Sequence, residues 1–91
     1  MSVHSVLATL TSVSAYPATP QVDLPFLPDS LYLKVESGTP GVLVSFDGVN
    51  DHLHVVSTDL LVLVRTRCRK VWLKEDGAGA STFRVSAFTD A

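Results

Sequence analysis

The sequence contains a single cysteine, Cys68, and this scarcity limits the kind of protein it can be. One cysteine cannot form an intrachain disulfide or a cysteine-based metal cluster, so the chain is not a disulfide-stapled scaffold. We expect this lone thiol to be buried. It fits a protein made in a reducing compartment, or a particle assembled inside one.

Charged residues and long apolar runs are also scarce. Charged residues make up 18% of the chain and the net charge is −2, which argues against a general nucleic-acid binder. No apolar stretch approaches the roughly 20 residues that span a bilayer, so we expect no membrane partner. Apolar residues nevertheless make up 46% of the chain. This excess predicts that partner subunits cover part of the apolar surface.

The sequence has no window with the 3.6-residue periodicity of an amphipathic helix, and it has many with a period of two. Short alternating runs are separated by Gly, Pro and Asp at intervals of about ten residues, which is typical of sandwiches and small barrels. We therefore predict an all-β protein: an antiparallel β-sandwich or jelly-roll-like single domain with an extended N-terminal arm. The predicted strands lie at residues 30–37, 41–46, 53–56, 59–67, 70–74 and 81–88.

The pattern divides the chain into an N-terminal strand and proline-rich arm, residues 1–29, and a β-sandwich body, residues 30–91. The first 15 residues are rich in Val, Leu and Thr but follow neither period cleanly. Four of the five prolines fall in residues 16–29, which predicts an extended connector. We expect Phe26 and Leu27 to insert into a hydrophobic groove, and deletion of residues 1–24 to leave a folded body that assembles poorly.

The run 59–69 has apolar residues on both of its faces. Leu60, Val62 and Val64 share one face, and a second face carries Leu61, Leu63, Arg65, Arg67 and Arg69. A small sandwich has one interior, so the second face is interpreted as an oligomer interface with an arginine rim. Two alternatives remain open at this point. A bulge could exchange the faces midway, or the N-terminal arm could fold over this strand.

Charge is unevenly distributed along the chain. Residues 1–64 carry a net charge of −5, and residues 65–91 carry +3. The arginine rim could therefore attract Asp47, Asp51 or Asp59 of a neighbouring copy.

The sequence offers little catalytic chemistry. His52 and His54 lie two residues apart and could share a metal, but we interpret them as solvent-facing. The segment 47–51 reads as a hairpin turn. Glu75 and Asp76 are adjacent, so their side chains should point to opposite faces. No nucleophile elbow or phosphate-binding glycine loop is present. We expect no enzymatic activity, no cofactor and no metal.

The basic segment 65–74 contains the only tryptophan of the sequence. Lys70, Trp72 and Lys74 share a face by parity, which suits stacking on a sugar or a nucleic-acid base. Trp72 is equally suited to anchor a protein interface, or to lie in the core with the lysines extended along it.

Residues 27–55 and 70–88 together resemble small virion structural proteins of tailed bacteriophages. The resemblance covers about two-thirds of the chain and leaves residues 1–26 unmatched. The matching motifs are three strands and their turns: Val42, Val44, Phe46, Asp47 and Gly48; Val71, Trp72 and Leu73; and Arg84, Val85, Ala87 and Phe88.

The resemblance implies a capsid decoration (cement) protein, or a neck or tail accessory protein, with a β-sandwich or jelly-roll body. It implies a homo-oligomer, with a trimer favoured, that binds the major capsid protein or another virion protein. The protein would be assembled into the virion in the host cytoplasm. A carbohydrate- or nucleic-acid-binding β module that uses Lys70, Trp72 and Lys74 is the alternative.

Overall fold

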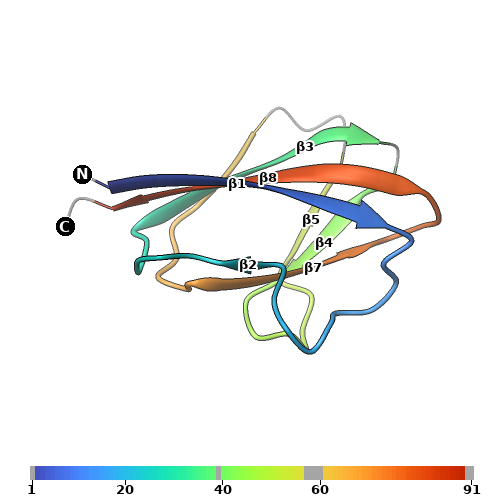
Figure 1. The fold of residues 1–91 in the computed structure, drawn as a ribbon, viewed down its shortest axis with the longest axis horizontal. Coiled ribbons are helices and arrows are strands. Elements are labelled where there is room, and N and C mark those ends of the chain that lie inside the picture. The colour runs from blue at the N-terminus through green and yellow to red at the C-terminus, as the bar shows by residue number, and fades with distance from the viewer. Residues whose placement is uncertain (1, 39, 57–60, 90–91) are drawn as a thin grey trace.

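The computed structural model describes residues 2–38, 40–56 and 61–89, and these form a sandwich of two antiparallel sheets (Figure 1). The described residues contain strands and no helix, and hence no helix that could cross a membrane. The eight strands are β1 (Ser2–Thr11), β2 (Val22–Asp23), β3 (Ser30–Gly38), β4 (Val42–Ser45), β5 (Leu53–Val55), β6 (Val62–Val64), β7 (Lys70–Glu75) and β8 (Ala80–Thr89).

The topology is that of a long hairpin rolled up on itself. One sheet has the order β1-β8-β3-β6 and the other has the order β2-β7-β4-β5. The first strand therefore pairs with the last, the second with the seventh, the third with the sixth and the fourth with the fifth. Eight antiparallel strands in this double Greek-key order form a jelly roll. The predicted β-sandwich is thus confirmed.

Alternation along each strand builds the core between the sheets. In β8, every second side chain points inward and the others point to solvent, as the period of two predicts. The buried apolar residues are Ala8, Leu10, Val22, Leu24, Leu31, Leu33, Val35, Val42, Val44, Val55, Val71, Leu73, Phe83, Val85 and Ala87. All of them belong to one cluster.

The N-terminal arm forms the edge of the second sheet rather than a separate appendage. Only β2 is paired as a strand, which agrees with the extended connector predicted for residues 16–29. The Gln21 side chain replaces a backbone partner, because its amide donates to the Leu73 carbonyl at 2.7 Å and accepts from the Leu73 N–H at 2.9 Å. At the start of the arm, the Val13 N–H donates to the Glu75 carboxylate at 2.9 Å.

The arm also contributes to the core. Val22 and Leu24 are fully buried, and Leu10 in β1 is 1% exposed. Phe26 packs against the same core of its own chain, whereas Leu27 is 44% exposed. Deletion of residues 1–24 would therefore remove core side chains and two edge strands, β1 and β2. This changes the sequence-based expectation, and we now expect the truncated chain to unfold.

Two leucines in the arm provide a matched test of this role. Leu24→Ala should cost about 2–5 kcal/mol of unfolding free energy, because it leaves a cavity in the core. Leu27→Ala, three residues away, should cost about 0.5 kcal/mol or less, because this side chain is already partly in water. Urea unfolding followed by circular dichroism measures both. Equal losses of unfolding free energy in the two variants would contradict the placement of Leu24 in the core and Leu27 at the surface.

Candidate assembly surface

The outer face of the sheet β1-β8-β3-β6 carries a row of apolar side chains that crosses all four strands. Val3 lies opposite Phe88, and Tyr32 lies opposite Leu63. The Tyr32 and Phe88 rings join the two halves in an edge-to-face contact, with centroids 4.9 Å apart. Val3 and Leu63 are 57% and 52% exposed. We call these four residues the apolar band.

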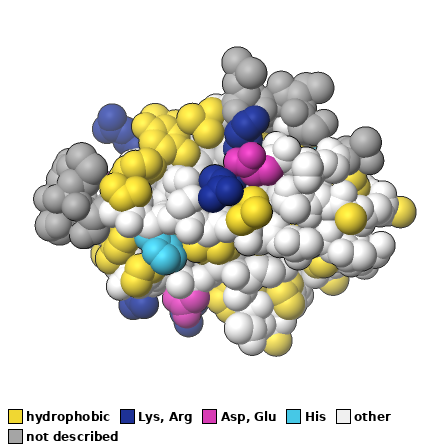
Figure 2. Space-filling model, turned by 45° about the horizontal axis from the view of Figure 1, so that its top comes forward, with side chains coloured by type: hydrophobic (Ala, Val, Ile, Leu, Met, Phe, Trp, Pro, Cys, Tyr) yellow, Lys and Arg dark blue, Asp and Glu magenta, His cyan; other side chains and the backbone are white. Residues whose placement is uncertain are grey.

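The band lies on a face that should be polar. An antiparallel sheet with one face on the core usually presents polar side chains on the other. Figure 2 shows hydrophobic side chains gathered at one end of the molecule, next to a group of basic and acidic side chains. On the outer face of the same sheet, Arg84 lies 3.1 Å from Glu36 and 3.0 Å from the Ser5 hydroxyl. The band and the charged group together resemble the apolar centre and polar rim of a protein interface.

An open pocket lies at the β3–β6 end of the band. Its lining residues are Asp29, Ser30, Tyr32, Leu63 and Arg65. Asp29 is held at 3.0 Å by Arg67 and at 3.2 Å by the Thr89 hydroxyl. Arg65 has no hydrogen bond or ion pair with any described residue, so its charge is available to a partner.

The structure places the two faces of the run 59–69 as parity predicts. Leu61 and Leu63 are 56% and 52% exposed, whereas Val62 and Val64 are half-buried and pack against the core. The strand is shorter than predicted, because β6 spans only Val62–Val64. Leu60 and Asp59 lie outside the described residues. The proposed interface role of Leu61 and Leu63 remains a prediction.

The other predicted interface residues do not gather on this face. Arg67 pairs with Asp29, and Arg69 donates to the Leu24 carbonyl at 2.9 Å and lies 3.8 Å from Asp23. These two arginines therefore serve the fold of their own chain. Phe26 is packed on the core and Leu27 stands apart on the arm. Cys68 is half-buried rather than fully buried.

Trp72 belongs to the outer face of the opposite sheet. The β7 pattern buries Val71 and Leu73 and turns Trp72 outward with its two lysine neighbours, so the core position considered for Trp72 is wrong. A turn covers the indole, since a Cβ at Gly48 would lie 3.0 Å from its Cε2 atom. Lys74 is 3.3 Å from Asp51 and lies over the Tyr16 ring, 4.6 Å from its centroid. These contacts leave Trp72 and Lys74 less available for a sugar or a base.

The turn over Trp72 is organised by Asp47. Its carboxylate accepts hydrogen bonds from the Val49 and Asn50 amides, the Asn50 side chain and the Ser45 hydroxyl, at 2.8–2.9 Å. These bonds, led by the Asn50 amide, lower the pKa of Asp47 far below its ordinary value. Gly48 has a φ of 78°, a conformation that suits glycine. The turn predicted at 47–51 is present between β4 and β5.

Tyr16 was not identified from the sequence, although it connects the arm to this turn. Its hydroxyl donates to Asp51 at 2.5 Å. Partial burial, followed by the hydrogen bond to Asp51, raises the pKa of Tyr16. The same hydrogen bond lowers the pKa of Asp51, together with Lys74. Nothing in the sequence around Tyr16 indicates a contact with Asp51, which lies 35 positions later.

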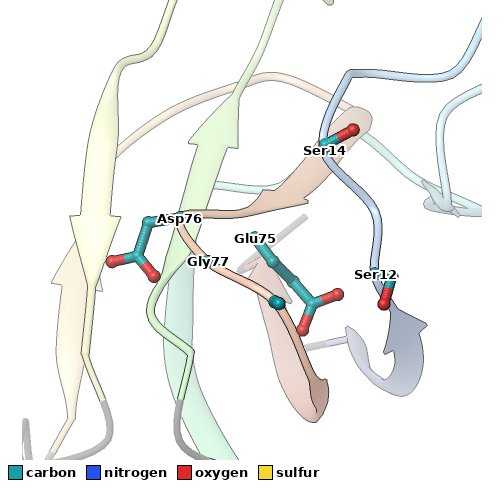
Figure 3. Close-up of a pocket in the computed structure, with 6 residues that line it drawn as sticks. Ser12, Ser14, Glu75, Asp76 and Gly77 are labelled. Atoms are coloured by element: carbon teal, nitrogen blue, oxygen red, sulfur yellow. The ribbon is translucent and has the colours of Figure 1, made fainter.

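The two adjacent carboxylates point in opposite directions, as expected. Figure 3 shows Glu75 directed toward Ser12 and Asp76 directed to the other side of β7. Glu75 is buried and accepts from the Val13 N–H and, at 3.2 Å, from the Ser81 hydroxyl. Asp76 accepts from the Gly41 N–H at 2.8 Å and lies 2.6 Å from Nε2 of His54. Both carboxylates therefore hold segments of the chain together.

The histidines also have local partners. The ring of His52 stacks on Phe46, and its Nδ1 accepts from the Phe46 N–H at 3.1 Å. The exposed His54 faces Asp76, while Val55 points into the core. Within residues 2–38, 40–56 and 61–89, no three His, Cys, Asp or Glu side chains are grouped as metal ligands.

Ion pairs within the chain use most of the charge asymmetry. Four bases of the C-terminal segment pair with four acids of the N-terminal segment: Arg67 with Asp29, Arg69 with Asp23, Lys74 with Asp51, and Arg84 with Glu36. The opposite charges of the two segments therefore attract each other within a single chain.

No family model matches the sequence, and no curated protein or solved structure is significantly similar to it.

The Asp47 turn generates a pH prediction. The pKa of Asp47 in the folded protein lies below its unfolded value of about 3.9. This carboxylate therefore contributes its full stabilisation when the pH is above about 3.9. It is lost as the pH falls toward the folded pKa. Asp47→Asn should lower the melting temperature near neutral pH, and the difference from the wild type should shrink below about pH 4. Thermal melts across this range measure it.

Asp23→Asn is the control, because it removes a carboxylate whose ion pair is longer, at 3.8 Å. Its effect on the melting temperature should be smaller. A difference between wild type and Asp47→Asn that is the same at neutral and acidic pH would contradict the assignment.

Proposed function

We propose that the protein is a non-enzymatic structural component of a tailed-bacteriophage virion, a capsid decoration protein that oligomerises and clamps neighbouring capsid subunits. The observation that carries this proposal is the apolar band on the outer face of the sheet β1-β8-β3-β6. The site that the proposal assigns to self-association consists of Tyr32, Leu61, Leu63 and Arg65, with Phe88 beside them.

Exposure and chemistry support this site. Leu61 and Leu63 are more than half exposed, although the same strand turns Val62 and Val64 to the core. The two aromatic rings and the arginine, which has no partner among the described residues, are residue types enriched in protein interfaces, and the two leucines add exposed apolar area. At about 25 cal/mol per Å², covering such side chains is favourable, and the gain must exceed the cost of association.

The fold is compatible with a virion protein. Jelly rolls occur in viral capsid proteins and also in lectins, so the fold alone does not assign a function. The resemblance of residues 27–55 and 70–88 to phage decoration and tail accessory proteins favours the virion. That resemblance also favours a homotrimer, in which the site of one copy would meet a different surface of the next.

The first test separates the interface from the core. Leu61→Ser with Leu63→Ser should dissociate the oligomer held by this site and leave the circular dichroism spectrum unchanged. Val62→Ala with Val64→Ala is the matched control. It should cost about 1–2 kcal/mol of stability per side chain, since these residues are half-buried. Sedimentation velocity measures assembly, and urea unfolding measures stability.

A double serine variant that forms the same oligomer as the wild type at the same concentration, or that unfolds as readily as the valine variant, would contradict the assignment of the faces. Salt should weaken assembly only modestly. Arg65 is the one arginine of the predicted rim without a partner in the described chain, and exposed charges are screened within about 8 Å at physiological ionic strength.

The second test addresses the virion. A major capsid or tail gene should lie next to the gene for this chain. Shells assembled from that capsid protein should pellet with the purified chain, and an unrelated protein of equal size should stay in the supernatant. A strictly monomeric chain that never pellets with shells would refute decoration.

A further inference from the structure

The first strand, β1, is a long edge with no protection against pairing. It pairs with β8 from Ser2 to Thr11 without a bulge, and it stands at the end of its sheet. Within the described chain, β1 has no partner strand on its other side. Part of its backbone N–H and C=O groups therefore face outward along ten residues.

The other three edges of the sandwich differ from β1. β2, β5 and β6 are two or three residues long, and short edge strands offer little template for pairing. Natural sheets usually protect a long edge with lysine, proline, an inward charge or a bulge. The segment Ser2–Thr11 has no Lys, Arg, Asp, Glu or Pro, and its one titratable side chain is His4. Among the edges formed by the described residues, only β1 is both long and unprotected.

The sequence of the edge is self-complementary. Val3, Ser5 and Leu7 share the outer face, with Val3 57% and Leu7 48% exposed. Two antiparallel copies of β1 related by a two-fold axis at Ser5 would set Val3 of each copy opposite Leu7 of the other. The outer faces would remain continuous, because the pairing joins odd positions to odd positions. Of the registers that keep the faces continuous, this one gives both exposed apolar side chains an apolar partner.

We propose that β1 is a self-association edge, at which residues 2–8 of two copies pair antiparallel around Ser5 and join two four-stranded sheets into one of eight strands. The occupant is a second copy because an edge with no charge offers no recognition for a charged peptide and because its apolar–Ser–apolar pattern reads the same in both directions. The contact is isologous and closes as a dimer. It uses a surface different from the Leu61–Leu63 site and does not depend on the virion assignment.

Two variants with equal numbers of substitutions test the register. Both are made in the full chain that already carries Leu61→Ser and Leu63→Ser, so that the other proposed contact is absent. Val3→Lys with Leu7→Lys places lysine opposite lysine twice across the two-fold axis. Val3→Lys with Leu7→Glu places lysine opposite glutamate twice. Positions 3 and 7 are exposed, so neither pair of changes removes a core side chain.

The parent is the full chain that carries only Leu61→Ser and Leu63→Ser. We expect it to form a concentration-dependent dimer in sedimentation equilibrium. The Lys/Lys variant should raise the dissociation constant about tenfold or more, because like charges directly opposite one another are destabilising. The Lys/Glu variant should dimerise about as well as the parent. Amide hydrogen exchange within residues 2–8 should slow as the concentration of the parent rises, a readout that a contact between side chains alone would not produce.

A parent that remains monomeric at millimolar concentration would overturn the proposal, while leaving the Leu61–Leu63 site and the virion role intact. A Lys/Lys variant that dimerises like the parent would also overturn it. If both variants are monomeric, the Ser5-centred register is refuted. Thermal melts of each variant confirm that the monomer is folded.

Discussion

The structure depends on the apolar layer between the two sheets, which is the only interior that the eight strands enclose. β8 is central to it, because this strand lies between β1 and β3 and contributes Phe83, Val85 and Ala87 to the layer. A sandwich of this size has no second core in which to place further apolar residues. Val3, Leu7, Leu61 and Leu63 remain on the surface for this reason. The exposed apolar side chains of the outer face and of the edge strand β1 are thus consequences of one constraint.

The parts of the fold that are local in sequence could be predicted. Alternation within a strand depends on residues two apart, so parity separates Leu61 and Leu63 from Val62 and Val64. The opposite directions of Glu75 and Asp76 follow from parity in the same way. Parity left open which face of the run 59–69 is the core and whether Trp72 points outward. The order of the strands within each sheet could not be predicted, because β1 pairs with β8 across nearly the whole chain and no local pattern specifies that partner.

The arm and the arginines show where sequence reasoning fails. Four prolines predicted an extended segment but could not reveal that Val22 and Leu24 enter the core. The Gln21 side chain bonds to the backbone of β7, and nothing in the local sequence indicates this contact. Arg67 and Arg69 appeared to continue the face of Leu63. In the structure the strand ends at Val64, and both arginines turn to acids of the arm segment.

The outer face and the β1 edge are physically connected. Val3 belongs to both, since it lies opposite Phe88 on one side and, in the proposed dimer, opposite Leu7 of the second copy. Pairing at β1 would therefore extend the apolar band of each copy by one residue, Leu7 of the other copy, within a continuous sheet. The β1 contact would then fix the separation between two Leu61–Leu63 sites, one at each end of the eight-stranded sheet. Two sites held at a fixed separation bind a repeating surface more tightly than one, provided that their spacing matches the repeat.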